Sequence, residues 1–239
     1  DDLQKKFLPQ VLALSEEYSI NQLMPLMAKG NSATESEKLE AAKTMSRFSG
    51  ISEEAIISYN LDVPTTFFWK ELLREEGFTI GRLDSRYKGI DKIAGGDRPD
   101  YWAELTSWNH SFAPAINYYF KNVLKFETDV KYNLFGPVYP WDWKNNNSGE
   151  SLRKAMAANP YLHTMIQSGY YDGATRYFDA KYTMWQLDPS GKMKDRLSFE
   201  GYRSGHMMYL REVDLIKSNS DIRKFIKKTI PSSTKPAKY

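Results

Sequence analysis

The chain contains no cysteine among its 239 residues, and this absence removes several kinds of chemistry at once. Disulfide bonds, thiolate metal ligands and a cysteine nucleophile are all excluded. Long apolar runs are also missing, because no stretch approaches the roughly 18 apolar residues of a membrane-spanning helix. The start, Asp1-Asp2, has neither a methionine nor a signal-peptide pattern, which is typical of a chain cut from a longer one.

The chain also lacks a large excess of either positive or negative charge. The 33 basic and 30 acidic residues are interspersed, and the formal net charge is only +3. Basic residues gather only near the C-terminus, at Arg223, Lys224, Lys227, Lys228, Lys235 and Lys238. Such a cluster indicates nucleic acid only beside a base-stacking or groove-entering element. We therefore interpret it as a solvated helix face and tail, and expect neither a nucleic-acid nor a membrane partner.

The composition otherwise suits a packed core, because 41% of the residues are hydrophobic and 14% are aromatic. The first third is predicted to be helical. Helix starts are indicated by capping residues or proline at Thr34, Ser52, Pro64 and Ser111, and helix ends by Gly50 and Gly77. Residues 79–101 follow no period and are predicted to be irregular, and the turn-rich residues 145–149 suggest a boundary.

Beyond that boundary the pattern becomes α/β. The predicted order is a helix at 151–158, a strand at 162–167, a helix at 174–187, a strand at 196–200 and helix over much of 208–228. Strands that alternate with helices predict parallel pairing. Two strands cannot form a sheet covered on both faces, so we expect the rest of the sheet to lie in a polypeptide outside this sequence.

Two loop residues follow these predicted strands. Asp172 lies in the turn Gly-Tyr-Tyr-Asp-Gly after the first strand, and His206 follows Ser204-Gly205 after the second. Reactive groups of open α/β sheets gather at the carboxyl ends of the strands. If the strands are neighbours, the carboxylate accepts a hydrogen bond from one imidazole nitrogen and leaves the other to take a serine proton. The sequence therefore predicts an acid and a general base.

The serine that this pair needs is missing, because the chain has no G-x-S-x-G turn. Residues 149–153 begin like one, but Arg153 stands where the second glycine belongs, and no apolar strand precedes them. We interpret Ser151 as a helix cap.

The other histidines have less support as functional residues. His110 lies beside Ser111 at the predicted helix start, and His163 is predicted inside a strand. No H-x-x-H pattern or carboxylate cluster has the spacing of metal ligands, so we expect neither a metal nor a cofactor.

Residues 161–175 and 202–210, with their Gly-Tyr-Tyr-Asp and Gly-His-Met motifs, resemble the C-terminal part of the serine carboxypeptidase family, especially its bacterial members. Residues 70–74, 81–89 and 140–143 resemble the family's insertion and the stretch that follows it. One departure is Arg176, where relatives usually carry proline.

The resemblance implies an α/β-hydrolase fold: a largely helical cap at 1–148, the C-terminal part of the core at 149–230 and a tail at 231–239. It implies that Asp172 and His206 are the triad acid and base, and that Met207 helps to line the pocket for the substrate's C-terminal residue. The family's Gly-Glu-Ser-Tyr-Gly elbow and oxyanion hole belong to the N-terminal half, which this sequence lacks.

These expectations describe part of an enzyme that removes C-terminal amino acids from peptides through an acyl-enzyme, and that is inactive without its N-terminal half. Family members are usually secreted, so we expect a secreted or periplasmic protein, and a homo-oligomer stays open. Two alternatives also stay open. One is a helical binding module that uses aromatic residues such as Phe67, Phe68 and Trp69, and the other is another α/β-hydrolase such as an aminopeptidase.

Overall fold

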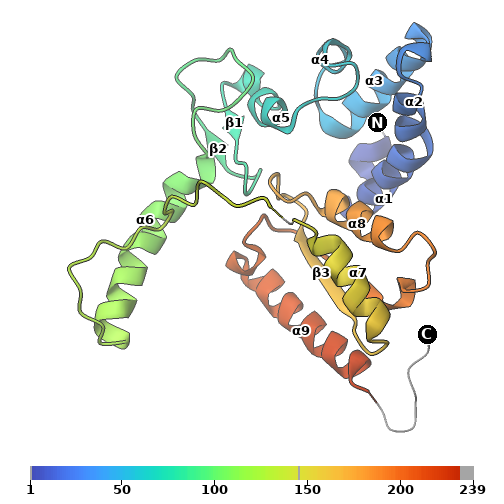
Figure 1. The fold of residues 1–239 in the computed structure, drawn as a ribbon. Helices are drawn as coiled ribbons and strands as arrows, with labels where there is room; N and C mark the ends of the chain where they lie inside the picture. Colours follow the sequence, from blue (N-terminus) through green and yellow to red (C-terminus); the bar gives the residue numbers. More distant parts are fainter. Residues whose placement is uncertain (1, 145, 232–239) are drawn as a thin grey trace. The chain divides into compact units, whose positions relative to one another are not determined.

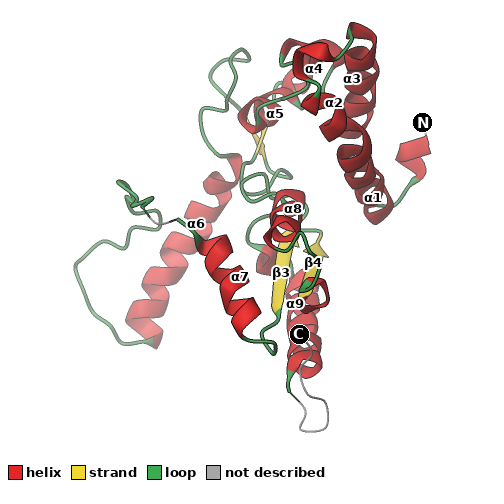
Figure 2. Ribbon diagram, turned by 45° about the vertical axis from the view of Figure 1, so that its right-hand side comes forward, coloured by secondary structure: helices red, strands yellow, loops and turns green. Residues whose placement is uncertain are grey.

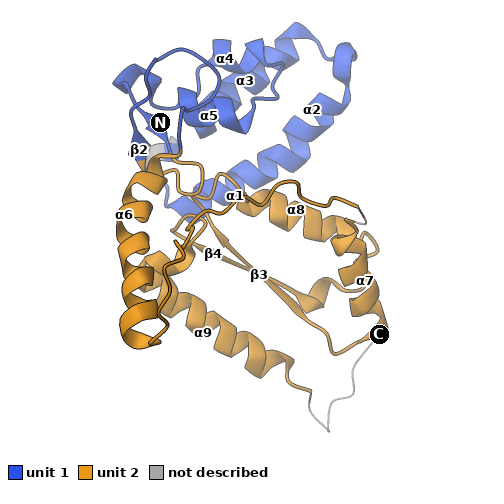
Figure 3. Ribbon diagram, turned by 60° about the vertical axis from the view of Figure 1, so that its left-hand side comes forward, with its two compact units in different colours: residues 1–80, 88–101 blue, residues 81–87, 102–239 orange. Residues whose placement is uncertain are grey.

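A computed structural model describes residues 2–144 and 146–231. The chain divides into two compact units, coloured separately in Figure 3. Unit 1 comprises Asp1–Ile80 and Lys88–Tyr101, and unit 2 comprises Gly81–Tyr87 and Trp102–Tyr239. The sequence predicts a boundary between a hydrolase cap and a hydrolase core at residue 148. The division into two compact units does not test that boundary. The predicted tail falls almost entirely outside the described residues.

Unit 1 is mainly helical (Figure 1). Its helices are α1 (Leu8–Tyr18), α2 (Met24–Ala28), α3 (Glu35–Ser49), α4 (Glu53–Ser58) and α5 (Thr65–Glu71). A π-helical stretch, Ser19–Leu23, joins α1 to α2, and 3-10 turns lie at Asp2–Lys5, Gly30–Ser32 and Arg74–Glu76. Strands β1 (Thr79–Ile80) and β2 (Lys88–Gly89) pair antiparallel.

The ends of α3 confirm the predicted capping. The Thr34 side chain accepts a hydrogen bond from the Glu37 amide at 3.2 Å, and the Glu37 carboxylate accepts one from the Thr34 amide at 2.8 Å. These reciprocal bonds satisfy amides that have no partner within the helix. Gly50 ends the helix with a φ of 78°, a left-handed conformation that glycine adopts without a steric penalty.

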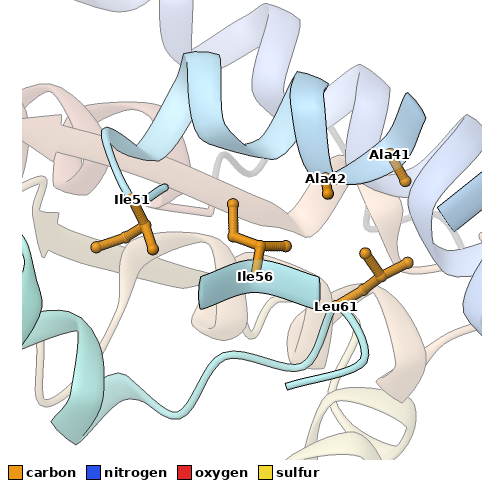
Figure 4. Packing of buried hydrophobic residues seen from close by; sticks show 5 residues of the cluster. All are labelled: Ala41, Ala42, Ile51, Ile56 and Leu61. Carbon is orange, nitrogen blue, oxygen red and sulfur yellow. The ribbon is translucent and has the colours of Figure 1, made fainter. Parts of the chain in front are cut away.

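The core of unit 1 consists of five buried aliphatic residues: Ala41, Ala42, Ile51, Ile56 and Leu61 (Figure 4). Phe67 and Phe68 pack against this cluster, and Trp69 is itself buried. The alternative of a helical binding module named these three aromatic residues as docking groups, and their packing inside unit 1 does not favour that role. The apolar face of α5 is used inside unit 1.

A buried ion pair anchors the glycine-rich residues that follow β2. The Lys70 ammonium on α5 pairs with Asp91, and the two side chains are only 2% and 3% exposed. Lys70 also donates to the Ile93 carbonyl at 2.7 Å, while the other Asp91 oxygen accepts from the Asp100 amide at 3.2 Å. The predicted irregularity of residues 79–101 is confirmed only in part, because β1 and β2 lie within that range. Residues 90–101 are irregular, and polar contacts hold their backbone.

Replacing Lys70 with methionine should lower the free energy of unfolding by about 3–5 kcal/mol, because it leaves the Asp91 carboxylate buried without its cation. Adding Asp91→Asn should recover part of that loss. The measurement is urea unfolding followed by circular dichroism. Lys88→Met is the control, because Lys88 pairs with Glu76 at the exposed surface, where a pair contributes at most about 1 kcal/mol. Equal losses for Lys70→Met and Lys88→Met would contradict the prediction.

Unit 2 contains the α/β part of the chain (Figure 2). Its elements are α6 (Ala103–Tyr118), a π-helical turn (Tyr119–Val123), α7 (Ser148–Ala158), β3 (Thr164–Gly169), α8 (Tyr177–Leu187), a 3-10 turn (Lys194–Arg196), β4 (Leu197–Tyr202), a 3-10 turn (Met208–Leu210) and α9 (Glu212–Thr229). Strands β3 and β4 run between α8 and α9 (Figure 3).

The parallel pairing of the two strands is confirmed. Thr164 lies opposite Leu197 and Gly169 opposite Tyr202, with α8 as the crossover between the strands. The described residues are therefore mixed and mostly helical, with two small two-stranded sheets. No larger hydrolase sheet occurs in the part of the chain that the structure describes.

Two serine predictions are wrong. Ser111 does not start a helix, because α6 begins at Ala103 and the Ser111 hydroxyl donates to the Ser107 carbonyl at 3.0 Å inside that helix. A serine that bonds back along the helix in this way has no capping role. Ser151 is likewise inside α7, whose N-cap is Asn147, and its amide donates to the Asn147 carbonyl. Ser151 thus lies within a helix and not on a strand-to-helix elbow.

Candidate functional site

The site begins where β3 and β4 end side by side. Beyond the last ladder pair, the Tyr170 amide donates to the Tyr202 carbonyl at 2.9 Å, and the Tyr171 amide donates to the Ser204 carbonyl at 3.0 Å. Gly169 permits this approach, because a Cβ at that position would clash with the backbone of Ser204 and Gly205. The loops that carry Asp172 and His206 therefore leave the sheet in contact.

The Asp172 carboxylate is buried and held from several directions. Its Oδ1 accepts hydrogen bonds from the amides of Ala174 at 2.8 Å and Thr175 at 3.0 Å. Its Oδ2 accepts from the Thr175 hydroxyl at 3.0 Å and lies 2.8 Å from His206 Nδ1. The two amides fix the side chain as in an Asx turn, so that Oδ2 is directed at the imidazole.

The His206 side chain is 46% exposed and is anchored on its Nδ1 side. Nδ1 lies 2.8 Å from Asp172 Oδ2 and 3.0 Å from Thr175 Oγ1. No hydrogen bond from Nε2 occurs among the described residues. A carboxylate at Nδ1 favours the tautomer that is protonated there and leaves the Nε2 lone pair available to accept a proton.

The loop of His206 is fastened to the start of α9. The Ser204 hydroxyl, which is buried, bonds to the buried Asp214 carboxylate and lies 3.2 Å from the Met208 carbonyl. Arg211 pairs with the same carboxylate at 3.1 Å. The Ser204 hydroxyl thus forms structural hydrogen bonds. In the described part of the chain, no serine hydroxyl forms a hydrogen bond with His206.

A second support comes from Gly81–Tyr87, which belongs to unit 2 although its flanking residues belong to unit 1. The Leu83 carbonyl accepts from the His206 amide at 2.7 Å, and the Arg82 carbonyl accepts from the Gly173 amide at 2.9 Å. The Ser85 amide donates to the Tyr171 carbonyl at 2.9 Å. This segment therefore contacts both loops. The sequence placed this segment only in the resemblance to the family's insertion and gave it no part in the site, because the residues that hold it are distant along the chain.

Glu104 on α6 also binds the segment Gly81–Tyr87. Its side chain is fully buried, Oε1 accepts from the Leu83 amide at 2.8 Å, and Oε2 has no hydrogen-bond partner among the described residues. Burial raises the pKa of the Glu104 carboxyl, and the charge of Asp84 acts in the same direction, while backbone amides including that of Leu83 oppose them.

The remaining predicted residues lie as follows. Met207 is partly buried beside His206 and is the N-cap of the 3-10 turn Met208–Leu210. His163 comes one residue before β3, so its predicted place inside the strand is wrong, and burial together with Arg196 and Lys228 lowers its pKa. His110 is exposed on α6. The structure thus pairs Asp172 with His206 and with neither other histidine.

The described residues contain no group of three or more His, Cys, Asp or Glu side chains that could hold a metal ion. None of the described helices combines the length and the apolar composition that a membrane span requires. Comparisons with protein-family models, with curated proteins and with solved structures found no match.

Glu104→Gln should stabilise the protein at neutral pH. Because the folded-state pKa of Glu104 is raised above its ordinary value of 4.5, its contribution to stability is complete below that value and is lost as pH rises through the folded pKa. Glutamine keeps an acceptor for the Leu83 amide and does not ionise. The free energy of unfolding of the variant should therefore exceed that of the native chain at neutral pH and converge with it in acid.

Urea unfolding across a pH series measures this difference. Glu150→Gln is the matched control, because hydrogen bonding to Arg153 lowers the pKa of Glu150 and its substitution should have the opposite pH dependence. A difference between Glu104→Gln and the native chain that does not vary with pH would show that the carboxyl stays in one protonation state throughout.

Proposed function

We propose that this chain is the cap region and C-terminal core of a serine carboxypeptidase, and that it supplies the acid and the base of a Ser-Asp-His triad. The observation that carries the proposal is the contact of 2.8 Å between His206 Nδ1 and Asp172 Oδ2, from loops that follow adjacent parallel strands. The order acid, then histidine, is that of an α/β-hydrolase. The motif resemblance supports a peptide as the substrate.

In this mechanism Asp172 accepts the hydrogen bond of Nδ1–H and keeps the imidazole in one orientation. Nε2 takes the proton of the serine hydroxyl as the serine oxygen attacks the carbonyl carbon of the C-terminal peptide bond. His206 then gives that proton to the amine of the leaving amino acid, and an acyl-enzyme is left. His206 Nε2 then takes a proton from a water molecule as the water oxygen attacks the acyl-enzyme. Return of that proton to the serine oxygen releases the shortened peptide.

In the proposed enzyme, residues 1–148 form the cap and residues 149–230 complete the core. Met207 lines the pocket for the last side chain of the substrate. The N-terminal half of the same enzyme is the partner that supplies the serine elbow, the oxyanion hole and the groups that bind the substrate carboxylate. The enzyme acts outside the cytoplasm, in the periplasm or after secretion.

The purified chain alone should not react with a fluorophosphonate probe, because no serine hydroxyl of the described residues is activated by His206. Intact-mass spectrometry after incubation with the probe measures this. Stoichiometric labelling of Ser151, or of any other serine, would mean that the chain carries its own nucleophile. An unrelated, intact serine hydrolase is the positive control.

Supplying the N-terminal half should restore activity. The partner to co-express is the polypeptide encoded directly upstream of Asp1, which we expect to contain a Gly-Glu-Ser-Tyr-Gly elbow. The assembled protein should release the last amino acid from an N-blocked peptide and leave the C-terminally amidated version intact. Asp172→Asn should reduce kcat by about 10⁴-fold, and His206→Ala, which removes the base itself, by about 10⁶-fold.

The matched control for these variants is His163→Ala, which removes a histidine that is not paired with Asp172. Cleavage of amidated peptides from a free N-terminus would favour an aminopeptidase. Equal activity of His206→Ala and the native assembly would remove the proposed base.

A further inference from the structure

The segment Gly81–Tyr87 contains one side chain that reaches both loops of the site. The Arg86 guanidinium donates from Nε to Asp84 Oδ1 at 2.9 Å and from Nη2 to Asp84 Oδ2 at 2.6 Å. Its Nη1 donates to the Arg203 carbonyl at 2.9 Å, in the loop that leads to His206. The guanidinium also lies over the ring of Tyr171, 5.2 Å from its centre, beside Asp172.

We propose that Arg86 is a positioning residue for His206, which it holds through Asp84 and the backbone of the His206 loop. The inference rests on the proposed function only in treating His206 as the base. The positioning itself is a property of this chain and can be measured without the serine.

The path from Arg86 to the imidazole is short. Asp84 is buried, with a side chain only 6% exposed, and a Cβ added to Gly205 would clash with it and with the Leu83 carbonyl. The turn is therefore packed directly against the residue before His206. The same Leu83 carbonyl accepts the His206 amide at 2.7 Å. Displacing the Asp84 turn therefore displaces the backbone from which the imidazole projects.

Arginine is the residue that fits this task. A planar guanidinium bonds a carboxylate with two parallel hydrogen bonds and still has a donor and a stacking face available. Here the two bonds hold Asp84, the third donor holds Arg203 and the face covers Tyr171. Lysine presents a compact ammonium without such a face, so it cannot replace all three contacts at once.

Nuclear magnetic resonance of the full chain tests the inference. Ring ¹⁵N shifts of His206 report which nitrogen carries the proton, and they are recorded at a pH of about 8, where an ordinary histidine is neutral. The native chain should show the Nδ1-protonated tautomer. Arg86→Met should give a mixture of tautomers, and Arg86→Lys an intermediate result. His163 and His110 in the same samples serve as internal references.

Hydrogen exchange separates positioning from general stability. In Arg86→Met the His206 amide should exchange at least about 10-fold faster than in the native chain, while the amides paired between β3 and β4 keep their native rates. Arg153→Met is the matched control, because Arg153 makes the same kind of two-bond pair with Glu150 on α7. That control should change neither the tautomer nor the exchange of His206.

An unchanged His206 spectrum in folded Arg86→Met would overturn the inference, as would a uniform increase of exchange across unit 2. If Arg86→Met does not fold, the His206 tautomer and the exchange rate of the His206 amide are measured in Arg86→Lys and Asp84→Asn instead. Failure of the proposed function looks different, because the assembled enzyme would then lack carboxypeptidase activity while Arg86 still controlled the tautomer.

Discussion

Parallel pairing of β3 with β4 is the constraint on which the candidate site depends. Because Gly169 lies opposite Tyr202 at the carboxyl ends, the two loops that follow must start side by side. Their next backbone groups continue to pair, and the acid and the imidazole meet a few residues later. The side-chain contact is thus a consequence of strand register. A shift of one residue would turn each side chain to the opposite face of the sheet.

Polar contacts with α9 help to keep so small a sheet ordered. The Tyr202 hydroxyl, at the end of β4, accepts from Gln167 on β3 at 2.7 Å and donates to Asp221 on α9 at 3.2 Å. Lys217 completes the group with a bond of 2.7 Å to Asp221. Tyr202 and Asp221 are buried, and satisfied polar groups of this kind fix one arrangement of the elements they join. Both strands are thereby attached to α9, which also anchors the His206 loop through Asp214.

Local signals in the sequence were sufficient for some features and not for others. The start of α3 could be predicted because Thr34 and Glu37 cap each other within one turn. The pairing of Asp172 with His206 could be anticipated because polar residues after neighbouring strands converge. The predicted helix start at Ser111 was wrong, because the Ser111 hydroxyl donates to the Ser107 carbonyl inside the helix. The role of Gly81–Tyr87 could not be predicted, since its partners in the Asp172 and His206 loops are remote in sequence and leave no local pattern.

The four residues that support His206 all act on the Nδ1 side of the imidazole or on the backbone of its loop. Asp172 and Thr175 face Nδ1, Leu83 holds the amide, and Ser204 fixes the start of the loop. Among the described residues, none forms a hydrogen bond with Nε2. In the proposed enzyme, the base would thus be oriented before the nucleophile arrives. The missing half would then supply the serine and oxyanion donors without having to align the imidazole.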